Sequence, residues 1–151
     1  GRCGWLIRSR KVRPFLQRGA HKTPRPREEE LLKLVYCITR RADLSPEAFR
    51  RTWLEDHGPL VKSFADAIGA VRYVQSHTGE DDLNAAFIES RGLKPPYDGI
   101  TEVWFNSRDD MEAGMASEAG RKAAAALQED EARFIDFSKS CVFMTEEHEI
   151  F

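Results

Sequence analysis

The stretch SPEAFRRTWLEDHGPL, residues 45–60, organises the interpretation of the rest of the chain. Ser45 is a favourable N-cap, and the proline after it suits a first helical turn, where its missing N–H would be unpaired anyway. Phe49, Trp53 and His57 are spaced four residues apart, so they share one face of the helix. The stretch therefore predicts an amphipathic helix whose aromatic face ends in a histidine.

Gly58 and Pro59 follow the histidine directly, and we expect this pair to break the helix there. His57 is then a titratable imidazole held at a point where the backbone turns. The simpler interpretation is a histidine that only caps the helix C-terminus, where the dipole favours its cationic form. The local residues leave both interpretations open.

The segments around this helix alternate between strand and helix patterns. Tyr73, Gln75 and His77 share one face of the second strand, and Ile100, Glu102 and Trp104 share one face of the third. A carboxylate beside aromatic residues lies either at the surface or in a pocket. We expect strands over 31–40, 70–77, 100–105 and 139–145, helices over 46–57, 60–68 and about 107–131, and a long loop over 78–98 with a short helix at 83–88.

This order, β-α-β-β-α-β, predicts an α+β fold of the ferredoxin-like type. Its four-stranded antiparallel sheet carries the helices on one face only, so the other face needs cover. An aromatic residue on each strand makes a bare sheet implausible, and a homodimer with two sheets face to face is the economical solution. The four aromatic residues are Tyr36, Tyr73, Trp104 and Phe143.

Charge is unevenly distributed along the 151 residues, although the composition is ordinary, at 41% hydrophobic and 32% charged. Residues 1–27 hold nine Lys and Arg and no Asp or Glu, whereas the remainder holds 14 against 25, a balance of −11. We therefore divide the chain into a basic N-terminal extension, 1–30, and a domain, 31–151. The extension can be a transit peptide, a nucleic-acid or membrane arm, or a segment without a role, and we favour the last. The acidic domain predicts no nucleic-acid partner, and no apolar run approaches the roughly 18 residues that cross a membrane.

Three cysteines, Cys3, Cys37 and Cys141, are far apart and form no CxxC pair. This usage indicates neither a disulfide framework nor a structural zinc site, and it favours a reducing compartment, which we take as the cytoplasm. Cys37 and Cys141 fall in predicted strands and are expected to be small buried hydrophobic residues.

Five segments in order resemble the EthD family, a branch of the dimeric α+β barrel superfamily. The resemblance covers about residues 31–150, and its F-x3-W-x3-H-x-P-L block is fairly specific. The segments are Leu34-Val-Tyr, Phe49 to Leu60, Arg72-Tyr-Val-Gln-x-His77, Tyr97 to Phe105, and Phe134-Ile-Asp with Thr145-Glu-Glu-His148.

The resemblance implies a homodimer and a hydrophobic pocket between sheet and helices. The family carries an oxidoreductase association through fuel-ether degradation, and other relatives look like cofactor-free dehydratases, decarboxylases or cyclases of small aromatic compounds. Wider relatives of the barrel include haem-degrading monooxygenases. Because fold does not fix function, the reaction stays open.

With the motif in view, His57 becomes the expected general base, which removes a proton alpha to a carbonyl and returns it as an acid. Glu102 is expected to orient His57 or act as a second base, and Tyr73 to donate a hydrogen bond to an enolate oxygen. A partly exposed strand carboxylate and a tyrosine packed on the sheet are the simpler alternatives. The expected substrate-binding residues are Tyr36, Trp53, His77 and Trp104.

No close His and carboxylate spacing indicates a metal site, and no nucleotide-binding glycine motif is present. We therefore expect a cofactor-independent lyase, isomerase or cyclase acting on a small oxygenated hydrophobic compound. A binding or accessory protein of an oxygenase pathway is the alternative, and a haem protein with His57 as axial ligand is a third. The length of the 78–98 loop is typical of a lid over a pocket.

Overall fold

The computed structural model describes residues 31–151, so the predicted extension 1–30 lies outside the described residues. The elements, in chain order, are β1 (Leu32–Ile38), α1 (Pro46–Arg51), the π-helical turn η1 (Thr52–His57), α2 (Gly58–Ile68), β2 (Arg72–His77), α3 (Asp81–Arg91), β3 (Gly99–Phe105), α4 (Arg108–Ala116), α5 (Glu118–Glu131), the 3-10 turn η2 (Phe137–Lys139) and β4 (Cys141–Thr145).

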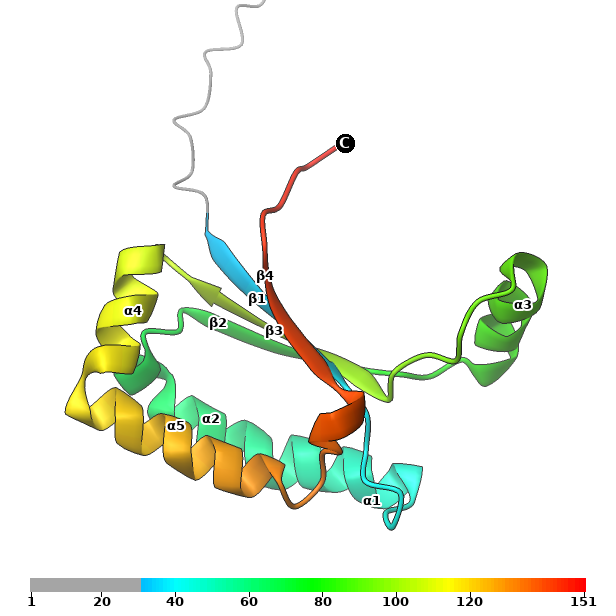
Figure 1. The fold of residues 1–151 in the computed structure, drawn as a ribbon, viewed down its shortest axis with the longest axis horizontal. Helices are drawn as coiled ribbons and strands as arrows, with labels where there is room; N and C mark the ends of the chain where they lie inside the picture. Colours follow the sequence, from blue (N-terminus) through cyan, green and yellow to red (C-terminus); the bar gives the residue numbers. More distant parts are fainter. Residues whose placement is uncertain (1–30) are drawn as a thin grey trace, which may run out of the picture.

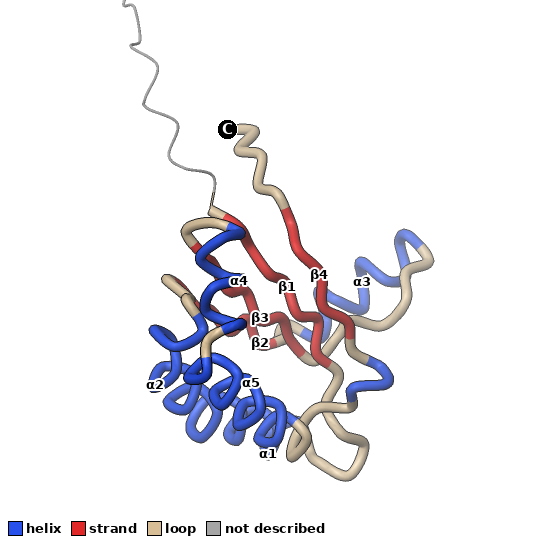
Figure 2. The backbone as a smooth tube through the Cα atoms, turned by 60° about the vertical axis from the view of Figure 1, so that its left-hand side comes forward, coloured by secondary structure: helices blue, strands red, loops and turns tan. Residues whose placement is uncertain are grey.

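The four strands form one antiparallel sheet in the order β2-β3-β1-β4. Helices α2 and α5 lie side by side across one face of the sheet (Figure 1), and among residues 31–151 no helix covers the other face (Figures 1 and 2). We call the uncovered side the open face. This arrangement confirms the predicted α+β, ferredoxin-like fold.

The predicted break of the helix at Gly58-Pro59 does not occur. Ser45 caps it as expected, its Oγ accepting from the Ala48 N–H at 3.1 Å, but η1 carries the helix on into α2. In η1 the Gly58 N–H donates to the Trp53 carbonyl, five residues back. Because a π-helical turn is wider than an α-helical one, it accommodates a proline that lacks an N–H and would crowd the carbonyl four residues before it. The helix ends instead at Gly69, whose φ of +74° suits glycine.

The hydrophobic core lies beneath the carboxyl end of β1, where α1 and η1 meet the segment after α5. Its buried members are Ile38, Phe49, Trp53, Phe134 and Ile135. The ring centroids of Phe49 and Trp53 are 5.4 Å apart, and those of Phe49 and Phe134 are 5.9 Å apart, distances typical of attractive aromatic pairs. The aromatic face predicted from the four-residue spacing is therefore the packed face of this helix.

The long connection between β2 and β3 forms a helix, α3, longer than the predicted helix at 83–88. Figures 1 and 2 show α3 standing apart from the other helices, beyond one end of the sheet. Leu83 and Phe87 on α3 are more than half exposed. The predicted lid therefore projects away from the layer between sheet and helices.

The strand boundaries shift by one or two residues from the prediction, as helix and strand ends commonly do. One burial prediction is wrong: Cys37 is buried, but Cys141 is exposed because β4 is an edge strand and Cys141 faces the open side of the sheet. In the described part of the chain, no helix has the length and apolar character that crossing a membrane requires.

Candidate functional site

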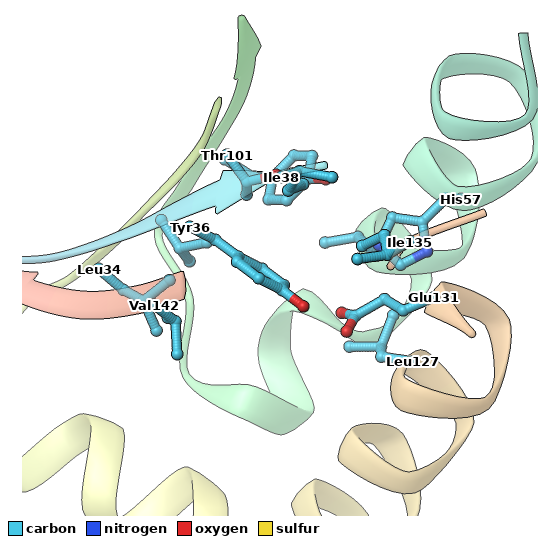
Figure 3. Close-up of a pocket in the computed structure, with 12 residues that line it drawn as sticks. Leu34, Tyr36, Ile38, His57, Thr101, Leu127, Glu131, Ile135 and Val142 are labelled. Carbon is cyan, nitrogen blue, oxygen red and sulfur yellow. The ribbon is translucent and has the colours of Figure 1, made fainter. Parts of the chain in front are cut away.

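A cavity of about 250 Å³ lies between the sheet and the helix layer, and strands β1, β2, β3 and β4 contribute to it together with α2 and α5. Figure 3 shows the side chains that surround it. Most are apolar, with a few polar groups among them, which is the usual composition of a small-molecule site. The lining residues are Leu34, Tyr36, Ile38, His57, Val61, Tyr73, Thr101, Val103, Leu127, Glu131, Ile135 and Val142.

His57 occupies the last position of η1 and is only 4% exposed. Its Nδ1 lies 2.8 Å from Oδ2 of Asp130, on α5. Burial lowers the pKa of His57, while the hydrogen bond to Asp130 opposes that decrease. The imidazole is therefore neutral at pH 7. Because an ionised carboxylate can only accept, Nδ1 carries the proton and Nε2 keeps a free lone pair.

Asp130 is itself held by an arginine. Arg133 Nη1 donates to Asp130 Oδ1 at 2.6 Å, and Nη2 of the same guanidinium lies 3.3 Å from Oδ2 of Asp56. The Asp130 side chain is only 12% exposed. Because both carboxylate oxygens are engaged, Asp130 is fixed in position, and it fixes the orientation of His57 in turn.

Glu131 follows Asp130 in the chain and, unlike Asp130, lines the cavity itself. Burial, reinforced by the charge of Asp130, raises the pKa of Glu131 to about 7. In Figure 3 its carboxyl group faces the hydroxyl of Tyr36 across the cavity. Burial and the charge of Glu131 together raise the pKa of Tyr36 to about 12. Near pH 7 the cavity thus holds a neutral imidazole, a neutral phenol and a carboxyl group that is close to half-protonated.

Tyr73 supplies a second phenol, on β2. Its hydroxyl accepts a hydrogen bond from Gln75 Nε2 at 3.2 Å, so its own proton is free to be donated. The same Gln75 nitrogen donates to the Trp53 carbonyl at 2.9 Å, which ties β2 to η1. Burial raises the pKa of Tyr73, so the phenol stays protonated at neutral pH.

Three of the residues predicted from the sequence line this cavity: His57, Tyr73 and Tyr36. Trp53 and His77 lie beside it instead. Their rings stack at 4.3 Å with an interplanar angle of 14°, and Trp53 is fully buried in the core. The structure therefore assigns these two rings to the support of the cavity and not to its lining.

Glu102 and Trp104 do not reach the cavity. Side chains alternate along β3, so Thr101 and Val103 face the helices while Glu102 and Trp104 face the open side. Glu102 accepts from Lys33 Nζ at 3.0 Å. Lys33 also lies over the Trp104 ring, 5.4 Å from its centroid. The predicted pairing of Glu102 with His57 is thus replaced by an ion pair on the opposite face of the sheet.

Sequence reasoning missed Asp130 and Glu131, the two acids of the site. One signal was present: Ala123, Leu127 and Glu131 are four residues apart, so Glu131 continues an apolar stripe of α5. A carboxylate in that position is either paired or aimed into a cavity.

The raised pKa of Glu131 predicts the direction in which the free energy of unfolding changes with pH. The folded protein holds this proton up to about pH 7, whereas the unfolded chain loses it near the ordinary glutamate pKa of 4.5. Between these values the folded state binds more protons, so the free energy of unfolding falls as pH rises. We expect titration of Glu131 to lower the free energy of unfolding by about 2 kcal/mol between about pH 5 and pH 8. Glu131→Gln should abolish this decrease.

Urea unfolding of the wild type and Glu131→Gln at both pH values measures this effect. His57, whose lowered pKa acts with the opposite sign below 6.5, is common to both proteins and cancels in the difference. Asp130, whose charge acts on Glu131, is common to both proteins, as are Tyr36 and Tyr73, on which Glu131 acts, and their contributions cancel likewise. Equal pH dependence in the two proteins would contradict the assignment.

In the described part of the chain, no group of three or more His, Cys, Asp or Glu side chains is arranged to hold a metal ion.

The EthD domain model matches residues 41–138. An EthD-family protein from Bacillus halodurans shares the fold with a TM-score of 0.53 at 14% identity, covering 78% of this chain and 99% of that one. An EthD-like protein from Ralstonia eutropha has a TM-score of 0.52 at 14% identity, covering 78% and 92%. A hypothetical Arabidopsis thaliana protein has a TM-score of 0.50 at 15% identity, covering 82% and 94%. No curated protein matches the chain.

Proposed function

The chain belongs to the EthD domain family, and from the cavity that its fold carries we propose that it is a cofactor-independent enzyme. In this proposal it moves protons on a small, oxygenated hydrophobic compound, as a lyase, isomerase or cyclase does. The observation that carries the proposal is the buried His57–Asp130 pair, 2.8 Å apart, at the wall of an apolar cavity.

The pair has the properties of a general base. Nε2 of neutral His57 accepts a proton from the carbon alpha to a substrate carbonyl, and Asp130 stabilises the imidazolium that forms. Asp130 does not touch the substrate, so its role is to position His57. The low polarity of the cavity strengthens this electrostatic stabilisation relative to water.

The other side of the reaction needs groups that stabilise an enolate oxygen. The hydroxyls of Tyr73 and Tyr36 are protonated at neutral pH and line the same cavity. Either can donate a hydrogen bond to the oxygen on which charge develops. Glu131, with a pKa of about 7, can donate a proton to the substrate and accept one from it.

The cavity limits the size and charge of the substrate. A volume of about 250 Å³ is just below the usual range for ligand pockets, so it suits a small molecule. Among the residues that the structure describes, no Lys or Arg lines the cavity, so we expect a neutral substrate. Small aryl ketones and 1,3-diketones meet these requirements and carry acidic protons alpha to a carbonyl.

Proton exchange tests the proposal without knowledge of the full reaction. The protein is incubated in D₂O with a panel of aryl ketones and 1,3-diketones, and deuterium at the alpha carbon is followed by NMR. We expect enzyme-dependent exchange for the members that fit the cavity. Binding of several members without exchange would contradict the enzyme and favour the second candidate, a binding or accessory protein, which the largely apolar lining also suits.

The proposal includes a homodimer formed through the open face. Phe143 of β4 is 47% exposed there and Ile100 of β3 is 36% exposed, on the two strands that flank β1 in the sheet. Apolar side chains gathered on one uncovered face are typical of an interface. A second copy of the same face is its natural cover, because a two-fold axis makes a patch complementary to itself.

Phe143→Lys is expected to weaken this dimer by about 30-fold in Kd, or about 2 kcal/mol, because it places a charge in an apolar interface. Sedimentation equilibrium measures the change. Met115→Lys is the matched control, since Met115 is at least as exposed as Phe143 but lies on α4, away from the open face. A wild-type protein that is monomeric at high concentration, or a Phe143→Lys dimer of unchanged affinity, would contradict the interface.

A further inference from the structure

The open face carries a pair of free thiols that the proposed reaction does not use. Cys37 of β1 and Cys141 of β4 are direct partners in the antiparallel register. Directly opposed residues point to the same side of a sheet, so both sulfurs lie on the open face. Cys37 lies opposite Ile100 and Cys141 begins an edge strand, which places the pair at a corner of the sheet.

The backbone geometry is compatible with a bond between the two sulfurs. Opposed Cα atoms in an antiparallel pair are about 4.5 or 5.5 Å apart, and both values fall within the range that a disulfide requires. Opposed Cβ atoms are about 4.5 to 5.5 Å apart, against about 3.5 to 4.5 Å in a disulfide. Closing the bond therefore needs a small movement of one strand, and the strain makes the bond easy to reduce again.

The two thiols differ in their exposure to solvent, and this difference sets the order in which they react with an oxidant. Cys141 is exposed, and the Tyr97 hydroxyl lies 3.4 Å from its Sγ. The ammonium group of Lys94 lies 3.1 Å from the same hydroxyl. Cys37 is only 8% exposed, and burial, reinforced by the neighbouring Cys141 thiol, raises the pKa of Cys37. In a protomer whose open face is free, an oxidant thus reaches Cys141 first, and Cys37 lies directly opposite it on β1.

We propose that Cys37 and Cys141 form a reversible redox site, closed to a cross-strand disulfide by a small-molecule disulfide such as glutathione disulfide. The Cys141 thiolate attacks one sulfur of glutathione disulfide, which forms a mixed disulfide and releases one glutathione. Cys37, as thiolate, then attacks the Cys141 sulfur, which forms the protein disulfide and releases the second glutathione. In total, two protein thiols are oxidised to one disulfide, and one glutathione disulfide is reduced to two glutathiones. The two protons that the protein thiols lose are taken up by the two glutathione thiolates.

The test uses the full chain with Cys3→Ser, so that Cys37 and Cys141 are its remaining thiols. After incubation with glutathione disulfide, we expect the intact mass to fall by two hydrogen atoms and peptide mapping to link Cys37 to Cys141. Dithiothreitol should restore both thiols. Formation of intermolecular disulfides alone, or of stable glutathione adducts without the internal bond, would overturn the proposal.

Single variants in the same background test the order of the steps. Cys37→Ser should trap glutathione on Cys141, because the second attack is lost. Cys141→Ser should react with glutathione disulfide at least about tenfold more slowly, because the remaining thiol is buried. Equal rates in the two variants would overturn the assignment of Cys141 as the first thiol. Far-UV circular dichroism of each variant verifies that it is folded.

Discussion

Replacing His57 by glutamine is expected to slow deuterium exchange into a bound ketone by about 10³-fold, because the variant loses its general base. Glutamine is chosen over alanine because its amide can still donate a hydrogen bond to the buried Asp130 carboxylate. The amide nitrogen has no basic lone pair, so it cannot take the proton. Initial rates of exchange measured by NMR, with ketone affinity measured separately, distinguish loss of catalysis from loss of binding.

His148→Gln is the matched control, because that histidine lies in the C-terminal tail with a side chain 69% exposed. We expect it to exchange at the wild-type rate. An active His57→Gln protein would eliminate the proposed base and leave the cavity as a binding site. Loss of affinity with an unchanged exchange rate at saturation would indicate that His57 only contacts the ligand.

Asp130→Asn separates the positioning role from the catalytic one. An asparagine amide can donate to Nδ1, which favours the wrong tautomer of His57 and removes the charge that stabilises the imidazolium. We expect exchange to fall by about 10²-fold or more. Because Asp130 raises the pKa of His57, its loss lowers that pKa, and the rise of the exchange rate with pH should move to lower pH. A profile identical to the wild type would show that Asp130 is only structural.

The fold was accessible from local patterns because each strand and helix carries its own signal. The four-residue spacing of Phe49, Trp53 and His57 correctly predicts their common buried face. The same spacing could not foresee η1. A proline after glycine normally ends a helix, and only the packed structure shows that a wider turn absorbs it.

The site was accessible only in part, for two physical reasons. Alternation along β3 correctly groups Glu102 with Trp104, but a pattern of period two does not say which group faces the helices. The partner of His57 is Asp130, 73 residues away, and that contact depends on how α5 packs against η1 and α2. Local spacing carries no information about such a contact.

The packing that delivers Asp130 and Glu131 to the cavity depends on two glycines where α2, α4 and α5 meet. A Cβ atom at Gly120, in the first turn of α5, would lie 1.8 Å from the Gly114 carbonyl oxygen and 2.9 Å from that of Ala67. A Cβ at Gly114 would lie 2.7 Å from the carbonyl of Ile68. These neighbours are backbone atoms, so they cannot rotate away as a side chain can.

Gly120→Ala is therefore expected to lower the free energy of unfolding by about 3 kcal/mol or more, at the upper end of overpacking effects, because relief requires α5 to move as a body. Gly79→Ala is the control, since a Cβ there meets nothing within 4 Å, and it should stay within about 0.5 kcal/mol of the wild type. Urea unfolding measures both. Because α5 carries Asp130 and Glu131, the folded fraction of Gly120→Ala should also lose deuterium exchange, whereas a stable, fully active variant would contradict the close approach of the three helices.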